Sequence, residues 1–541
     1  MGCAMQRRDF LKGTLGLGSG LSLWSSARPA RAMAAGQPPN IVFIHVDDMD
    51  ADELGAYGGK VLTPHMDSIA RQGCSFSRAY VNSALCVPSR YGTLTGRVAA
   101  RSPYLREKVP ADTPLNIVNI FASRPGTFPP VIVEEDVTLA NLLNNAGYVT
   151  GLFGKYHNSE EGLHRDRGPV RALDEISSES DPTDPEVNRL IRRRYRKVVR
   201  EVRDSTGFDV VERVYFDNKE SMGLPGELQF DNMPWITEGA LRFLDANADR
   251  PFFLYFSAPL PHRRIRQAGK NVMEHKVEEN MVTRDLRATP SGWLDAPPAP
   301  VQPSREDVIK RVREAGCALN STLITWLDDS VGAILNKLES LGLEKDTFIV
   351  FLSDHQTRAK RTNHELGVRT PMILKWPGHI RPGTRSDALV SSLDIAPTLA
   401  AVAGTPVREE WQGDGRSLVP LIRGAKNRIH ESLLLEQGYS RAVVTPRWKY
   451  IALRYPPSLD IPGDSREYYI DGKKHGWGLK KRLRRRPHLV DRDQLYDLEK
   501  DPEETNNLFG EPGYARITRV LQDRLREHLK DHPHPFGEFS H

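Results

Sequence analysis

Four short runs of apolar, β-forming residues constrain the fold of this chain more than any other feature of its sequence. They are continuous and rich in β-branched and aromatic residues, and they occupy residues 41–46, 148–153, 251–257 and 347–352. Such runs are typical of strands that a sheet buries on both faces. Amphipathic patterns of helical length lie between them, at residues 135–147, 237–247 and 305–341. This alternation predicts an α/β fold, a large mixed, mostly parallel sheet flanked by helices.

Length and composition set broad limits on the protein. A chain of 541 residues can bury one large core and a smaller domain beside it. Its net charge of +5 is too small to indicate nucleic acid binding by itself. No apolar run is long enough to cross a bilayer. We therefore expect neither a nucleic acid partner nor a membrane span.

The N-terminus predicts export. Arg7 and Arg8 precede a weakly apolar run at residues 13–23, and small residues at 30–32 offer a cleavage site. Paired arginines in this setting look like a bacterial twin-arginine signal. We therefore assign residues 1–35 to a signal peptide that the twin-arginine export machinery recognises, and we expect a periplasmic or secreted protein.

Acidic residues stand at the carboxyl ends of two predicted strands, where α/β sheets place their sites. Asp47 and Asp48 follow the first run, and Asp354 with His355 follows the last. Adjacent carboxylates at the end of a buried strand are costly unless a cation or basic side chains neutralise them. The pattern favours a hard divalent cation, and the alternative is a solvated acidic turn.

Basic residues stand at the ends of the other two strands. Lys155 and His157 are two residues apart, just past the second run, and His262 lies in a Pro-His pair past the third. At one edge of a sheet these side chains could reach a common anion. The alternative is a solvated lysine and histidines in solvent or in structural roles.

A cysteine motif lies between the first two runs. It begins at Cys86 and continues through Arg90 to Leu94, and it can form a helix with Pro88 as its first residue or Ser89 as its cap. A thiol at a helix N-terminus beside an arginine has a lowered pKa. The alternative is a buried, inert thiol.

As a whole, this motif resembles the signature of the type I sulfatases of the alkaline phosphatase-like superfamily. It matches as Cys-x-Pro-Ser-Arg followed by Leu94-Thr95-Gly96, and the resemblance extends over residues 39–530. In that family the formylglycine-generating enzyme oxidises the cysteine to formylglycine (3-oxoalanine), whose hydrate is the nucleophile. Conversion of Cys86 would leave Cys74 and Cys317, which lie in apolar patterns, and we expect both to be buried free thiols.

The resemblance gives roles to the residues at the strand ends. It implies one divalent cation, usually Ca²⁺, bound by Asp47, Asp48, Cys86 in its modified form, Asp354 and His355. It implies a sulfate pocket and catalytic set of Cys86, Arg90, Lys155, His157, His262 and Lys360. In these roles His262 or Lys360 protonates the leaving alcohol, and His157 takes a proton from the hydrate.

The chain departs from the family pattern at three positions. The family has a tryptophan and two glycines where this chain has Tyr156, Gln356 and Leu366. Two arginines also flank Lys360 and could compete for its role, Arg358 and Arg361.

Past about residue 425 the pattern changes to short β-forming stretches and one amphipathic helix, at residues 432–436, 440–444, 449–452 and 514–529. By resemblance this is a smaller C-terminal domain, an antiparallel sheet carrying one helix. We therefore expect a catalytic domain over residues 36–425 and a C-terminal subdomain over residues 426–541.

The resemblance implies a sulfatase, which hydrolyses sulfate esters. Export and the basic stretches at 192–197 and 480–486 suggest a sulfated carbohydrate as substrate, with a small sulfated molecule as the alternative. The stretch at 192–197 is either a solvated helix face or a surface for a polyanionic substrate. Two other functions stay open: a phosphonate or phosphate monoester hydrolase of the same superfamily, and a non-catalytic exported polyanion-binding protein.

Overall fold

The computed structural model describes residues 38–117, 127–159, 176–262, 285–405, 407, 411–454, 486–489 and 491–537. The predicted signal peptide at 1–35 and all but the last residue of the basic run at 480–486 lie outside the described residues. Within the described part of the chain, no helix combines the length and apolar character that crossing a bilayer requires.

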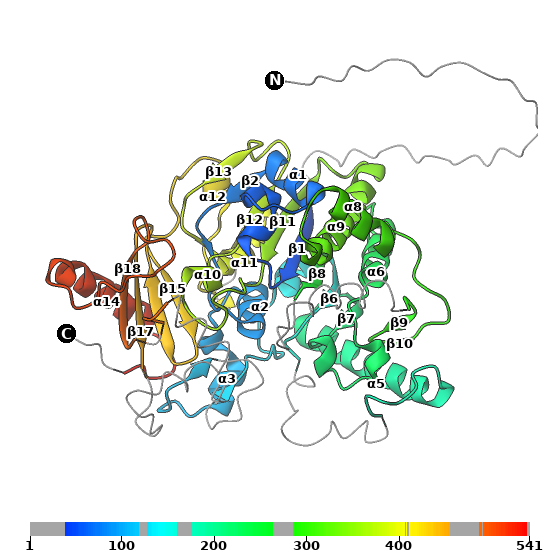
Figure 1. The fold of residues 1–541 in the computed structure, drawn as a ribbon, viewed down its shortest axis with the longest axis horizontal. Helices are drawn as coiled ribbons and strands as arrows, with labels where there is room; N and C mark the ends of the chain where they lie inside the picture. The colour runs from blue at the N-terminus through cyan, green and yellow to red at the C-terminus, as the bar shows by residue number, and fades with distance from the viewer. Residues whose placement is uncertain are drawn as a thin grey trace, which may run out of the picture.

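An eight-stranded sheet forms the centre of the molecule (Figure 1), with the strand order β13-β2-β12-β11-β1-β8-β6-β7. In chain order its strands are β1 (Asn40–Asp47), β2 (Cys74–Phe76), β6 (Val149–Lys155), β7 (Val210–Tyr215), β8 (Phe252–Pro261), β11 (Thr347–Ser353), β12 (Met372–Lys375) and β13 (Thr384–Ser386). The five strands from β11 to β7 are parallel, whereas β12 is antiparallel to both of its neighbours. The predicted mixed, mostly parallel sheet is confirmed.

Strands β1 and β8 lie side by side at the middle of this sheet, and every residue in both is buried. Their continuous apolar sequences suit this position because no face of either strand meets water. Strand β8 ends at Pro261, four residues past the predicted run, and so leads directly to His262.

Helices flank the sheet (Figure 1). They are α1 (Pro64–Gln72), α2 (Cys86–Thr95), α3 (Pro103–Lys108), α4 (Leu139–Asn144), α5 (Pro185–Thr206), α6 (Met233–Ala246), α8 (Arg305–Glu314), α9 (Thr322–Ser340), α10 (Glu365–Val368), α11 (Ile395–Val402) and α12 (Val419–Ile422). Short two-residue strands complete the large domain: β3 (Ala79–Tyr80), β4 (Asn116–Ile117), β5 (Thr127–Phe128), β9 (Ala288–Thr289), β10 (Gly292–Trp293) and β14 (Val390–Ser391).

Three predicted helix patterns differ from the observed bounds, and α6 begins four residues before its pattern at 237–247. The pattern at 305–341 is two helices, α8 and α9, and the chain turns between them at Gly316, whose φ of 65° is left-handed. Helix α4 begins four residues later than predicted because the side chain of Thr138 caps it and accepts a hydrogen bond from the backbone of Asn141.

The C-terminal part forms a second, antiparallel sheet, as expected. Its strands are β15 (Leu433–Gln437), β16 (Ser440–Val444), β17 (Trp448–Leu453) and β18 (Asp493–Asp497), paired in that order. Helix α14 (Ala515–Leu529) packs on this sheet, where Leu521 and Leu525 meet Val443 and Tyr450 in one apolar cluster. In Figure 1 this unit lies at one end of the molecule and α5 lies near the other.

Candidate active site

Three carboxylates meet where β1 and β11 end. Asp47 is the last residue of β1, and the backbone N–H of Asp48 donates to Oδ1 of Asp354 at 2.9 Å. Asp48 holds a left-handed backbone with φ of 63°, which turns it back toward β11. One oxygen from each of the three carboxylates lies within 4.8 Å of the others, and all three residues are buried. The parallel pairing of the two strands therefore unites residues more than 300 positions apart.

Cys86 lies beside these carboxylates at the N-terminus of α2. The helix starts at Cys86 itself, so the prediction that Pro88 or Ser89 begins it is wrong. The hydroxyl of Ser89 does not cap the helix but donates to the backbone carbonyl of Asp354 at 2.5 Å. This bond holds the start of α2 against the end of β11.

The Cys86 thiol is enclosed by charged groups. Its Sγ lies 3.2 Å from Nε2 of His355, 3.6 Å from Nζ of Lys360 and 3.9 Å from Oδ1 of Asp48. Burial raises the pKa of the thiol well above its ordinary value, and Lys360 opposes the shift only in part. The lowered pKa expected from the helix start is therefore wrong, because burial outweighs both the helix terminus and the nearby cations.

Arg90 ties the strand ends together from α2. The side chain is fully buried, and its Nε donates to Oδ2 of Asp354 at 3.0 Å. One terminal nitrogen donates to the hydroxyl of Ser257 on β8 at 2.6 Å and to the carbonyl of Lys155 at 3.3 Å, and the other lies 3.4 Å from Asp47. A single guanidinium thus contacts residues of four adjacent strands.

Lys155 and His157 reach the same centre from β6. The ammonium of Lys155 pairs with Oδ2 of Asp47 and donates to Oδ1 of Asn218 at 2.6 Å. The Nε2 of His157 lies 2.9 Å from Oδ1 of Asp217. Burial and then Lys155 lower the pKa of His157 to about 4, although Asp217 opposes the shift. His157 is therefore neutral at pH 7.

Two of these neighbours, Asp217 and Asn218, were not expected from the sequence. They follow β7, a strand that the charged stretch at residues 160–230 concealed because it carries Glu212 and Arg213 at its centre. The available signal was positional: a polar pair directly after a strand, as at Asp47 and Asp48.

His262 and Lys360 complete the set of predicted side chains. Nε2 of His262 lies 3.6 Å from Oδ2 of Asp48, and Nζ of Lys360 donates to both oxygens of Asp48 at 2.8 and 2.9 Å. Burial lowers the pKa of Lys360, but Asp48, Cys86 and Asp47 together more than offset this and the net shift is upward. Of the competing arginines, Arg358 pairs with Asp50 and Asp52.

His355 points its imidazole into the carboxylate cluster. Nδ1 lies 3.1 Å from the carbonyl of Gln356, and Nε2 lies 3.0 Å from Oδ1 of Asp48. Gln356, the departure from the family's glycine, is buried, and its side chain links two backbone segments by accepting from Ala51 at 3.0 Å and donating to Arg369. The larger residue is therefore accommodated without displacing His355 from the cluster.

The donor set suits a hard divalent cation. Oδ1 of Asp47 is buried and accepts no hydrogen bond from the described residues, although a terminal nitrogen of Arg90 lies 3.4 Å away. Carboxylate oxygens are the ligands that such ions prefer, and a buried carboxylate oxygen that accepts no hydrogen bond has room for one more contact with a cation. Three groups of residues here hold possible ligand atoms within 4.8 Å of one another, and Asp47, Asp48, Cys86, His262, Asp354 and His355 make them up.

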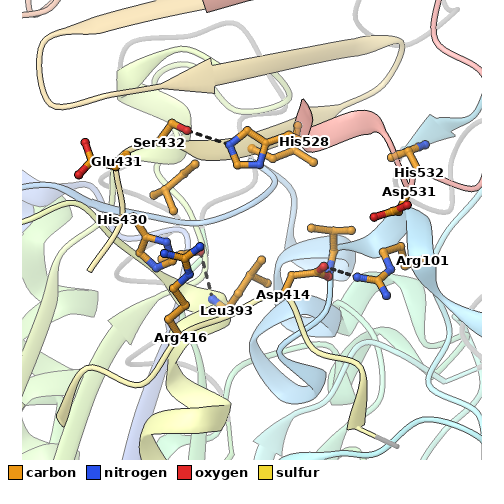
Figure 2. Close-up of a pocket in the computed structure, with 14 residues that line it drawn as sticks. Arg101, Leu393, Asp414, Arg416, His430, Glu431, Ser432, His528, Asp531 and His532 are labelled. Atoms are coloured by element: carbon orange, nitrogen blue, oxygen red, sulfur yellow. Dashed lines mark hydrogen bonds and ion pairs between the residues drawn. The ribbon is translucent and has the colours of Figure 1, made fainter. Parts of the chain in front are cut away.

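A separate cavity of about 320 Å³ lies where the C-terminal sheet meets the large domain. Figure 2 shows Arg101 paired with Asp414 on one side and His528 bonded to Ser432 on another. None of the predicted site residues lines this cavity.

Two described cysteines lie away from the site. Cys74 and Cys317 are free thiols, as expected. Cys74 is buried, and burial raises its pKa to about 11. Cys317 is partly exposed, so its predicted burial is wrong, because it stands in the turn between α8 and α9 rather than inside a helix.

Comparison with known proteins places the fold and the site in one family. The sulfatase family model matches residues 39–405, which span the eight-stranded sheet. An N-acetylgalactosamine-6-O-sulfatase of Bacteroides thetaiotaomicron is 27% identical and covers 90% of this chain and 93% of its own length. Human arylsulfatase A is 26% identical, over 92% of this chain and 88% of its own.

A solved structure shares the same fold. A Bacteroides thetaiotaomicron protein, described in connection with the metabolism of multiple glycosaminoglycans, superimposes with a TM-score of 0.58 at 22% identity, covering 91% of this chain and all of its own. Since the family model covers most of the chain and the relatives align over nearly all of it, this protein belongs to the sulfatase family and is a sulfuric ester hydrolase.

Proposed function

We propose that the protein is a formylglycine-dependent sulfatase that hydrolyses sulfate esters of a sulfated carbohydrate with one divalent cation, calcium. The observation that carries the proposal is the meeting of two charge sets around residue 86. Asp47, Asp48 and Asp354 supply carboxylates, and Arg90, Lys155 and Lys360 supply cations.

The formal charges of these two sets cancel. A divalent cation bound by Asp47, Asp48, Asp354, His355 and the modified residue 86 would give the site a surplus of positive charge, which suits an anionic ester. When present, the cation and the formylglycine hydrate supply an activated hydroxyl nucleophile and neutralise charge on the sulfate.

The protein's own side chains stabilise charge and move protons. Arg90, Lys155 and Lys360 are cations directed at one centre, and they stabilise the charge that develops on the sulfate oxygens. His157 is neutral and paired with Asp217, so it can accept a proton from residue 86. His262 or Lys360 delivers a proton to the leaving alcohol.

The proposed substrate is a sulfated sugar, and the proposed protein is matured at Cys86 and exported. The alignment of a relative named N-acetylgalactosamine-6-O-sulfatase with 90% of the chain supports a sulfated sugar.

We propose catalytic and C-terminal units of residues 36–425 and 426–541, conversion of Cys86 by the formylglycine-generating enzyme, and twin-arginine export to the periplasm or medium. Arg7→Lys with Arg8→Lys should retain the protein in the cytoplasm, measured by cell fractionation; normal export of this variant would contradict the route.

Mass spectrometry of the peptide holding residue 86 tests the proposal. Protein from its native host should carry formylglycine and hydrolyse sulfate esters, whereas Cys86→Ala should fold and be inactive. Chelation should abolish turnover, and Ca²⁺ should restore it and raise the melting temperature. An unmodified thiol in active protein would overturn the mechanism. Faster hydrolysis of matched phosphate or phosphonate esters would favour that reaction instead.

A further inference from the structure

Helix α5 concentrates the positive charge of the protein. Its 22 residues include eight basic and three acidic side chains. The net charge of the whole chain is +5, so this helix alone carries an excess of positive charge equal to that of the entire molecule. Clustered charge of this kind attracts polyanions.

The arrangement of these residues is regular. One exposed row, the arginine stripe, consists of Arg189, Arg193, Arg196, Arg200 and Arg203. Successive members are four or three residues apart, which places them on a single face of the helix, and the row is about 21 Å long at 1.5 Å per residue. The opposite face packs into the protein through Ile191, Arg194, Val198, Val202 and Thr206.

Among the described residues, the ion pairs of the stripe involve only its first and last members. Arg189 pairs with Glu186 and Arg203 with Asp204, both near the ends of the helix. Within the described part of the chain, no carboxylate forms an ion pair with the three central members, Arg193, Arg196 and Arg200. Like charges three and four residues apart destabilise a helix. A solvated helix face whose only role was solubility would be more stable if positive and negative side chains alternated along it.

The stripe begins on the side of the molecule that holds the active site. Helix α5 runs antiparallel to β7, because only three residues connect its end at Thr206 to the start of the strand at Val210. The hydroxyl of Tyr195, at the middle of the helix, then accepts from the backbone of Val214 at 2.8 Å, near the carboxyl end of the strand. Residues 185–194 therefore extend past the edge of the sheet where the catalytic side chains lie. Arg194 stacks over Phe216, 5.2 Å from its ring centre.

The chain that leaves β7 connects this region to the reaction centre. Directly after Phe216 come Asp217, which lies 2.9 Å from His157, and Asn218, which accepts from Lys155 at 2.6 Å. The anchor of α5 and the sulfate pocket thus belong to one continuous segment.

We propose that the arginine stripe binds the remainder of an anionic, multiply sulfated saccharide chain whose reacting ester occupies the active site. This assignment rests on the proposed sulfatase function and makes a polymeric or oligomeric substrate the preferred one. The contacts are ion pairs with sulfate or carboxylate groups of flanking sugar units. Binding to a linear polyanion by such contacts weakens as salt concentration rises.

Steady-state kinetics on two substrates test the assignment. The variant Arg193→Gln/Arg196→Gln/Arg200→Gln changes exposed positions only. We expect its KM for a sulfated oligosaccharide to rise about tenfold at low salt, with kcat within twofold of wild type, because each exposed ion pair contributes modestly. Its KM for 4-nitrophenyl sulfate should not change. In the wild type, the oligosaccharide KM should rise with salt, and in the variant this dependence should be shallower.

Two control variants test whether the change in KM depends on the location of the removed charges and on the loss of charge itself. Arg516→Gln/Arg519→Gln/Lys530→Gln removes three exposed charges, two in the first turns of α14 and one just past its end, at the opposite side of the molecule, and should keep the wild-type KM. Arg193→Lys/Arg196→Lys/Arg200→Lys keeps the charge of the stripe and should retain most of the oligosaccharide affinity.

The outcomes distinguish the two proposals. If the wild type hydrolyses neither substrate, the proposed function fails. If it hydrolyses both and the glutamine variant keeps the wild-type KM for the oligosaccharide, only the stripe assignment fails. Loss of double-stranded DNA binding in that variant, with unchanged saccharide kinetics, would likewise overturn the assignment to substrate.

Discussion

The pair formed by His157 and Asp217 is the residue-level feature that most sharpens the proposed chemistry. A histidine that accepts a proton works best when a second group fixes its ring and stabilises its charged form. Asp217 is buried and meets Nε2 of His157, and it raises the pKa that burial and Lys155 depress. Asp217 is therefore a positioning residue that acts through His157.

Asp217→Asn should lower kcat about 10- to 100-fold with little change in KM, since the base loses part of its typical contribution. Loss of the carboxylate removes an effect that raises the pKa of His157, so the acid limb of the pH–kcat profile should move to lower pH. The matched exposed change Asp204→Asn should leave the profile unaltered. An unchanged rate and profile in Asp217→Asn would show that the contact is only structural.

His262 and Lys360 can be distinguished by the leaving group. A poor alkyl leaving group needs a proton, whereas an activated nitrophenolate does not. Alanine at the true proton donor should therefore cost about 100-fold or more on an alkyl sulfate and much less on 4-nitrophenyl sulfate. Alanine at the other residue should slow both substrates alike. Equal losses for both variants on both substrates would assign the proton to neither residue.

Local sequence could predict the residues of the site that belong to motifs, and it failed where a role depends on a distant contact. Asp47 and Asp354 stand at recognisable strand ends and Cys86 in a recognisable motif, and the structure brings them together. The role of Asp217 depends on its contact with His157, 60 positions earlier, and its only signal in the sequence is its place just past β7, a strand that charged residues concealed. The raised pKa of Cys86 likewise depends on burial, which no short motif encodes.

At the level of elements, one helix caps another. The side-chain carboxyl group of Asp328 on α9 accepts from the backbone N–H groups of His65 and Met66 at the start of α1, at 3.1 and 2.7 Å. A Cβ on Gly332, one turn further along α9, would lie 2.6 Å from the His65 ring, so the glycine permits this close approach. Such a cap satisfies N–H groups that a helix leaves open.

Asp328→Ala should lower the free energy of unfolding by about 1–3 kcal/mol, because two buried donors lose their acceptor. Burial raises the pKa of Asp328 to about 8, well above its unfolded value, so the folded protein binds an extra proton between about pH 4 and 8. This contribution to stability is present below pH 4 and is lost as pH rises toward 8. Asp328→Asn should flatten that decline, measured by thermal unfolding at pH 5 and pH 8, and an unaltered pH dependence would contradict it.

At the scale of the whole molecule, a buried charge cluster joins the C-terminal sheet to the segment that carries Lys360. The ammonium of Lys449 on β17 is fully buried and lies 2.6 Å from Glu365 and 2.9 Å from Glu504, and it donates to the carbonyl of Asn363 at 3.1 Å. The backbone N–H of Glu365 donates to Glu504 at 2.6 Å. The C-terminal unit therefore supports part of the active site.

Lys449→Met should destabilise the protein by about 3–5 kcal/mol, because it removes the ammonium that Glu365 and Glu504 share and leaves Glu365 with Arg369 alone. The melting temperature should fall and sulfate ester turnover with it, whereas the exposed change Lys500→Met should affect neither. Restored stability in Lys449→Met/Glu365→Gln/Glu504→Gln would assign the loss to the unpaired charges. Full stability of Lys449→Met would refute this role of the cluster.

The burial of helix α2 has a consequence for how the protein is made. All ten of its residues are buried, and Cys86 retains only 1% of its accessible surface. An enzyme that oxidises this side chain must reach the motif on a nascent or unfolded chain, so the modification can occur only before the chain folds. We expect the purified, folded, unmodified protein to resist conversion, while a synthetic peptide of residues 80–100 is converted, with both followed by mass spectrometry. Efficient conversion of the folded form would disprove this order. If modification does precede folding, the fraction of molecules that becomes active depends on the rates of synthesis and folding and not on the mature structure.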